Sequence, residues 1–143
     1  MRQVAAVWRS DDVERLVLLY SSDADTRAQV RLAVGRSLAS GVPPVVFVEC
    51  ATLPAVLLVL DTGRIDACVL DGETVPVGGM GVCWQIKNEV FQCPPVLLLI
   101  GRPQDAWLAT WSHADAVNTL PVEPVELAAS LAALLRTPRW TRP

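Results

Sequence analysis

Residues 65–80 read IDACVLDGETVPVGGM, and this stretch decides the fold. Its mostly apolar run at 65–70 has the length of a strand, stops at Asp71 and is followed by a loop punctuated by glycine and proline. The pattern predicts a buried strand that ends in a carboxylate. In open parallel sheets, ligands and chemistry collect at the edge formed by the carboxyl ends of the strands, so Asp71 is the first candidate functional residue.

The segments on both sides repeat this unit of an apolar strand followed by a helix. Strands are predicted at 16–20, 45–48, 65–70, 96–100 and 116–119, and helices at 24–38, 52–60, 79–91, 103–111 and 123–135. Continuous apolar strands are typical of a sheet that is buried on both faces. The sequence therefore predicts an α/β protein with a doubly wound, five-stranded parallel sheet and five helices.

Composition narrows the classes of function. The 143 residues suit one domain with an ample core, since 52% of them are hydrophobic. The net charge is only −3, with Lys87 the single lysine, so neither nucleic acid nor an anionic membrane is an expected partner. No apolar run approaches the roughly 20 residues that span a bilayer, and no signal peptide is evident, so we expect a cytoplasmic protein without membrane insertion.

The cysteines and the histidine do not predict a metal site. Four cysteines, at positions 50, 68, 83 and 93, show no Cys-x-x-Cys spacing, and the only histidine, His113, follows them at a distance. Cysteines in or beside apolar strands behave as small apolar residues. We therefore expect four structural thiols and no bound metal.

Four segments carry a resemblance to a known family: VLLYSSDADTRAQV at 17–30, IDACVLDGETVPVGGMGVCWQIK at 65–87, PPVLLLIGRPQD at 94–105 and ADAVNTLPVEPVEL at 114–127. In order and spacing, residues 15–136 resemble the receiver domain of two-component response regulators, the flavodoxin-like fold of the chemotaxis receiver. The chain resembles more closely a group of atypical stand-alone actinobacterial pseudo-receivers with the same DGE and GGMG segments. Residues 1–14 would then form an N-terminal leader and residues 137–143 a C-terminal tail.

The resemblance implies roles for five positions, and four of them are changed. A working receiver holds Mg²⁺ with an acidic pair after the first strand and with the phospho-accepting aspartate. Asp71 stands at the acceptor position, but the acidic-pair positions hold Ser21 and Ser22. The hydroxyl and lysine of the family's switch correspond to Ile100 and Leu120. We therefore expect no cofactor and no efficient phosphorylation, with Asp71 accepting hydrogen bonds from the serines or from loop amides.

Two alternatives stay open. In the first, Asp23 or Glu73 supplies the missing carboxylate, and Asp71 is phosphorylated in a conventional phosphorelay with a displaced Mg²⁺ site. In the second, residues 71–74, Asp-Gly-Glu-Thr, resemble the motif of haloacid dehalogenase-type phosphoryl-transfer enzymes, with Glu73 in place of a second aspartate. Such enzymes need a lysine late in the chain, whereas Lys87 comes directly after the motif. The glycines at 78–81 lack a phosphate-binding fingerprint and are expected to begin a helix.

If the chemistry is lost, function is expected to depend on surfaces. Trp107 and Trp111 are four residues apart, so they share one face of the predicted helix 103–111. That face either packs on the sheet or serves, with Val122 and the separate Trp84, as an interface anchor. The family's interface implies a protein partner or a second copy of the chain at residues 103–135. Because only seven residues follow 136, we expect no DNA-binding helix-turn-helix there. We expect an atypical receiver in bacterial two-component-type signalling, and not an enzyme.

Overall fold

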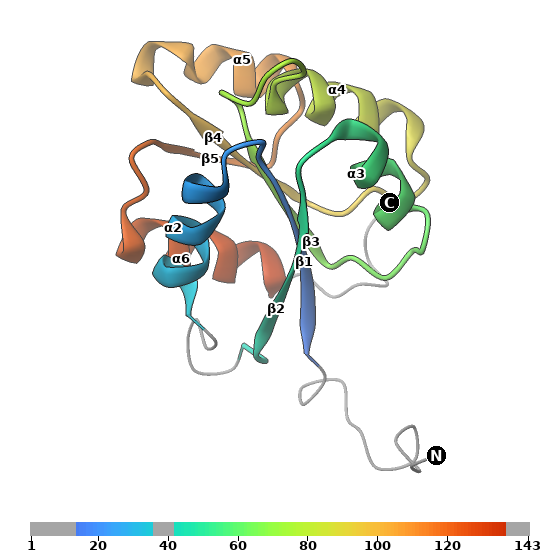
Figure 1. The fold of residues 1–143 in the computed structure, drawn as a ribbon, viewed down its shortest axis with the longest axis horizontal. Coiled ribbons are helices and arrows are strands. Elements are labelled where there is room, and N and C mark those ends of the chain that lie inside the picture. Colours follow the sequence, from blue (N-terminus) through green and yellow to red (C-terminus); the bar gives the residue numbers. More distant parts are fainter. Residues whose placement is uncertain (1–13, 36–41, 137–143) are drawn as a thin grey trace.

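The computed structural model describes residues 14–35 and 42–136 (Figure 1). The predicted leader, apart from Glu14, and the predicted tail at 137–143 lie outside the described residues. The elements follow in the order β1 Arg15–Tyr20, α2 Ala24–Val34, β2 Val45–Cys50, α3 Leu53–Leu60, β3 Ala67–Asp71, α4 Gly79–Glu89, β4 Val96–Ile100, a 3₁₀ turn Pro103–Asp105, α5 Ala106–Trp111, β5 Ala116–Thr119 and α6 Pro124–Leu135.

The five strands form one parallel sheet in the order β2-β1-β3-β4-β5, with β3 at the centre. Tyr20 of β1 is paired with Leu70, and Asp71 is paired with Leu99 of β4. Strands β1, β3 and β4 therefore end together at one edge, which is the upper edge in Figure 1. This confirms the predicted parallel sheet and places Asp71 at its carboxyl edge.

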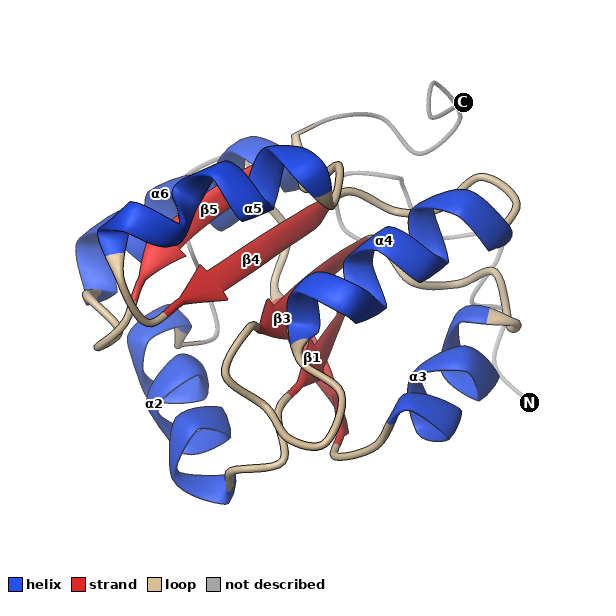
Figure 2. Ribbon diagram, turned by 90° about the horizontal axis from the view of Figure 1, so that it is seen from above, coloured by secondary structure: helices blue, strands red, loops and turns tan. Residues whose placement is uncertain are grey.

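Helices cover both faces of the sheet. Figure 2 shows α2 and α6 on one side of it and α3, α4 and α5 on the other. Successive residues of a strand face opposite sides, so Leu18 and Leu70 pack into the core under α3, α4 and α5, while Leu19 and Val69 pack into the core under α2 and α6. The continuous apolar strands predicted this two-sided burial correctly.

Several element bounds differ from the prediction for local reasons. The central strand begins at Ala67 because Asp66 donates its backbone N–H to Leu16 and accepts the Leu16 N–H on its carboxylate. Helix α2 ends at Val34 because Gly35 takes the left-handed φ of 64°. Leu38, which the apolar spacing placed in that helix, lies outside the described residues.

All four cysteines are free, and three of them, Cys50, Cys68 and Cys83, are buried. Burial raises the pKa of each of these three thiols, most strongly that of Cys68. They are therefore neutral at physiological pH and pack as small apolar groups in the core under α3 and α4. Within the described part of the chain, every helix is too short or too polar to cross a membrane.

Candidate functional site at the carboxyl edge of the sheet

Asp71 ends the central strand and is only 3% exposed. Its Oδ2 accepts a hydrogen bond from the Ser21 hydroxyl at 2.7 Å, and its Oδ1 accepts one from the backbone N–H of Glu73 at 2.9 Å. The first bond forms because β1 lies beside β3, so the residue after Tyr20 reaches the end of the central strand. Both carboxylate oxygens thus have partners within the chain.

The Ser21 side chain is fully buried, and its hydroxyl both donates and accepts hydrogen bonds. It accepts the backbone N–H of Asp23 at 3.0 Å and lies 3.4 Å from the Asp23 carbonyl oxygen. A hydroxyl carries one hydrogen, and the shorter bond to the charged carboxylate of Asp71 is the stronger of the two. Ser21 therefore serves Asp71 as a neutral donor that occupies the space beside Oδ2.

The loop after Asp71 is fastened to the loop after β1 by Thr74. Its side chain is 4% exposed, and its hydroxyl accepts the backbone N–H of Ser22 at 3.2 Å. The Thr74 N–H donates in turn to the Asp71 carbonyl at 3.2 Å. Sequence reasoning missed Thr74, although a Thr shortly after an Asp-Gly pair is a common local turn signal.

Tyr20 makes a second contact that holds the loop after Asp71, and the sequence did not predict it either. Its ring is buried, and its hydroxyl donates to the carbonyl of Val77 at 2.5 Å, on the far side of the same loop. Burial, together with the nearby negative charge of Asp71, raises the pKa of Tyr20, so the phenol keeps its proton. The signal in the sequence was a tyrosine that ends an otherwise aliphatic strand.

The two carboxylates that could have repaired the acidic pair are held elsewhere. Asp23 caps helix α2, since its Oδ1 accepts the N–H of Asp25 at 2.9 Å and its Oδ2 accepts the hydroxyl of Thr26 at 3.2 Å. Glu73 reaches toward the end of β4, where its Oε2 accepts the N–H of Gly101 at 3.3 Å. Asp71, Asp23 and Glu73 are thus each bonded to a different part of the edge.

The residues at this edge do not fit the Mg²⁺ that receiver domains normally bind. Mg²⁺ needs near-octahedral oxygen ligands with negative charge among them, whereas Ser21 and Ser22 are neutral. The nearby Glu49, at the end of β2, is ion-paired to Arg27 at 2.9 Å and to Arg31 at 2.7 Å. Across residues 14–35 and 42–136, no three His, Cys, Asp or Glu side chains are grouped closely enough to hold a metal ion.

The two switch positions are apolar and face different cores. Ile100 is 1% exposed and packs under α3, α4 and α5, whereas the half-buried Leu120 packs against the core under α2 and α6. The single lysine, Lys87, pairs with Asp115 at 2.6 Å, and Asp115 also accepts the N–H of Val96, the first residue of β4. Lys87 therefore lies at the opposite edge of the sheet from Asp71, where it cannot assist a phosphoryl transfer.

A separate feature of the surface is a cluster of three tryptophans on α4 and α5. Trp84 and Trp111 stack with ring centroids 6.1 Å apart and planes 13° apart. These two and Trp107 are 42%, 51% and 65% exposed respectively, so α5 does not turn its tryptophans onto the sheet. Val122 is half-buried and packs instead against the core under α2 and α6.

A five-stranded parallel sheet in this order is the flavodoxin-like fold, and an aspartate at the end of its central strand is the arrangement of receiver domains. Solved structures agree on the fold. A putative response regulator from Chloroflexus aurantiacus matches with a TM-score of 0.73 and 17% identity over 86% of this chain and 98% of its own. The chemotaxis response regulator CheY4 of Vibrio cholerae matches with a TM-score of 0.70 and 17% identity over 86% of this chain and 100% of its own.

Sequence relatives give the family. Uncharacterized response regulatory proteins from two strains of Mycobacterium tuberculosis, H37Rv and CDC 1551 / Oshkosh, are each 46% identical over 122 residues, which are 85% of this chain and 92% of the relative. No family model matches the sequence. The chain belongs to the response regulators of two-component signalling, as its resemblance to receiver domains predicted.

Proposed function

We propose that this response regulator is an atypical, single-domain receiver that signals through protein contacts, without Mg²⁺-dependent phosphorylation of Asp71. The observation that carries the proposal is the 2.7 Å hydrogen bond from the buried Ser21 hydroxyl to Asp71. It stabilises the carboxylate in the place where a metal ion would otherwise neutralise it. The relatives support a single domain, because the matched segment makes up 92% of their length.

The surroundings of Asp71 oppose phosphorylation in two ways. A dianionic phosphoryl group approaches a carboxylate only where positive charge compensates both, but the edge offers two serines and the apolar Ile100 and Leu120. Attack by Oδ2 would also require Asp71 to lose its bond from Ser21, and a buried donor that loses its partner costs free energy. The protein would therefore signal with Asp71 unphosphorylated.

Titration with Mg²⁺ and beryllofluoride, an analogue of the phosphoryl group, tests the proposal. We expect tryptophan emission to stay constant in the wild type and in Asp71→Asn alike. The reason is that the site offers neither Mg²⁺ nor beryllofluoride enough charged groups to compensate for the loss of their hydration. A saturable response that requires Mg²⁺ and disappears in Asp71→Asn would overturn the proposal. That result would make Asp71 a phosphorylation site with a displaced metal.

The tryptophan cluster is the surface that we propose for the protein contact. Large aromatic side chains supply much of the binding energy at interfaces, and three of them are exposed here on adjacent helices. The stack of Trp84 on Trp111 holds both rings in place before a partner binds, which lowers the entropic cost of association. The proposed partner is a protein, and a second copy of this chain is the form that can be measured directly.

Self-association should therefore depend on these rings. We expect sedimentation equilibrium to show a reversible dimer, and the double variant Trp107→Ser/Trp111→Ser to dissociate at least about tenfold more readily, equivalent to about 1.4 kcal/mol. Val125→Ser is the matched control, because Val125 is 76% exposed on α6 at the other face of the sheet. A wild type that stays monomeric, or a dimer weakened equally by both changes, would contradict the assignment.

A further inference from the structure

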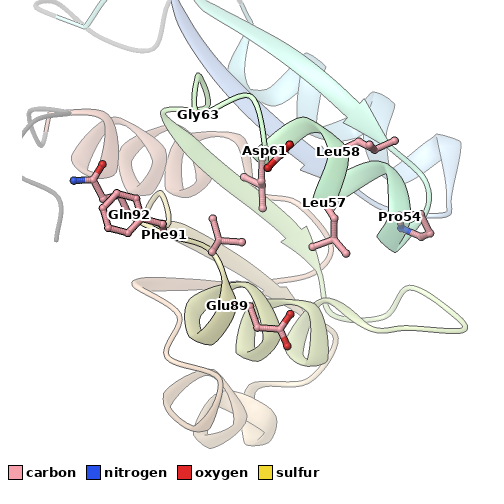
Figure 3. Close-up of a pocket in the computed structure, with 10 residues that line it drawn as sticks. Pro54, Leu57, Leu58, Asp61, Gly63, Glu89, Phe91 and Gln92 are labelled. Atoms are coloured by element: carbon pink, nitrogen blue, oxygen red, sulfur yellow. The ribbon is translucent and has the colours of Figure 1, made fainter.

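A groove runs between α3 and the end of α4, on the face of the sheet away from α2 and α6 (Figure 3). Its volume is about 1020 Å³. The residues on which the argument rests are Leu57, Leu58, Asp61, Glu89, Val90 and Phe91. Four of them, at positions 57, 58, 90 and 91, are apolar, and Asp61 and Glu89 are acidic.

The apolar part of the groove is uncovered in the described structure. Phe91 is 87% exposed and Leu58 is 74% exposed, which places both among the four most exposed large hydrophobic residues of the described chain. They come from different elements, one on α3 and one just after α4, and Figure 3 draws them at opposite ends of the view, with Leu57 pointing toward the space between α3 and α4. An apolar surface formed by two elements in this way favours an occupant with a large apolar side chain.

The charged side chains that line the groove are both acidic. Neither Asp61 nor Glu89 is ion-paired within the described residues, and no lysine or arginine lines the groove. Among the described residues, Glu89 accepts only a 3.3 Å bond from the side chain of Gln85, which lies one turn earlier on α4. The occupant that complements this site carries positive charge beside an aromatic or aliphatic side chain.

A segment of that chemistry follows the last described residue. Residues 137–143, outside the described structure, read TPRWTRP and contain Arg139, Trp140 and Arg142. Each helix of a doubly wound sheet runs back from the carboxyl edge, so α6 ends at the same edge as α3 and α4. Seven residues span at most about 23 Å, and the segment starts at the edge of the sheet where α3 and α4 also end.

We propose that the groove between α3 and the end of α4 binds residues 137–143 of the same chain. Trp140 packs on the apolar residues of the groove, and the arginines on either side of it pair with Asp61 and Glu89. The contact joins the C-terminal segment to the face of the domain that also carries the tryptophan cluster.

Fluorine NMR of the full chain labelled with 5-fluorotryptophan tests the contact. The chain contains five tryptophans, and Trp140→Phe assigns the Trp140 resonance. We expect that resonance to differ from the one in a free peptide of residues 136–143, and to move toward it in Glu89→Arg, as the docked-to-free ratio falls about fivefold. Phe91→Ser should have the same effect through the apolar part of the groove.

Two further variants make the result specific. Asp25→Arg is the charge control, because Asp25 is exposed in the first turn of α2 at the opposite edge of the sheet, and it should leave the Trp140 resonance in place. Adding Arg139→Glu to Glu89→Arg should restore the docked position. A wild-type resonance at the peptide position, or one unmoved by the groove variants, would overturn the proposal. A shift that grows with protein concentration would also overturn it, by showing that the segment binds a second copy.

Discussion

Ser21→Asp/Ser22→Asp is expected to be about 3–5 kcal/mol less stable than the wild type in EDTA, because a second buried charge is placed beside the first without a partner. The Ser21 hydroxyl lies 2.7 Å from Asp71 Oδ2, so a carboxylate in its place meets that oxygen directly. At about 10–100 times its Kd, Mg²⁺ should raise the free energy of unfolding of this double variant by about 1.4–2.7 kcal/mol, since the ion binds the folded state alone. The wild type should show no such dependence.

The measurement is urea unfolding with EDTA and with Mg²⁺, and Ser21→Asn/Ser22→Asn is the matched control. Asparagine has the shape of aspartate without its charge, so the control should be destabilised less and should not respond to Mg²⁺. Equal behaviour of the aspartate and asparagine variants would mean that the edge is not arranged to hold a metal even when the carboxylates are present. That outcome would mean that the backbone geometry of the edge, and not only the two serine side chains, prevents Mg²⁺ binding.

Ser21 is one of two neutral hydrogen-bond donors to the buried Asp71 carboxylate. A buried carboxylate needs hydrogen bonds or a counter-charge, and Asp71 receives two neutral donors, the Ser21 hydroxyl and the Glu73 N–H. A metal-binding receiver would instead present negative charge that only the cation compensates. The two hydrogen bonds stabilise the Asp71 carboxylate within the chain, which supports the structural role that we propose for it.

The sequence was sufficient for the fold because its main signals are local. Strands at 96–100 and 116–119 were predicted to the residue, since apolar runs bounded by proline or polar residues leave little freedom. The resemblance to receiver domains also predicted that Asp71 accepts hydrogen bonds from Ser21, Ser22 or loop amides, and the bond from Ser21 is present. The fastenings by Tyr20 and Thr74 could not be predicted, because they depend on the path of a loop between two strands.

The surface was harder to predict than the core. Helical spacing put Trp107 and Trp111 on one face, but spacing alone does not tell whether that face meets the sheet or the solvent. The stack of Trp84 on Trp111 joins two helices whose separation depends on the whole packing of α4 and α5. Side-chain contacts between elements are thus the part of the site that needed the structure.

Gly79→Ala and Gly81→Ala, two residues apart in the first turn of α4, should change stability in opposite directions. A Cβ at Gly79 would lie 2.7 Å from the Asp71 carbonyl oxygen and 2.8 Å from its carbon, whereas a Cβ at Gly81 meets nothing within 4 Å. We expect Gly79→Ala to lose about 1–3 kcal/mol because backbone must move to relieve the overlap. Gly81→Ala should gain about 0.5–1 kcal/mol because alanine favours the helix.

Urea unfolding of the two variants decides what the glycines at 78–81 are for. The opposite signs would show that Gly79 allows α4 to begin against the backbone of Asp71, and that Gly81 has no such role. Two changes of the same sign would contradict this account of the packing. Because the Gly79 overlap falls on the Asp71 carbonyl, that variant should also disturb the Thr74 N–H that donates to it, at 3.2 Å. Amide exchange at Thr74 should therefore be faster in Gly79→Ala and unchanged in Gly81→Ala, which ties the helix start to the geometry of the acceptor position.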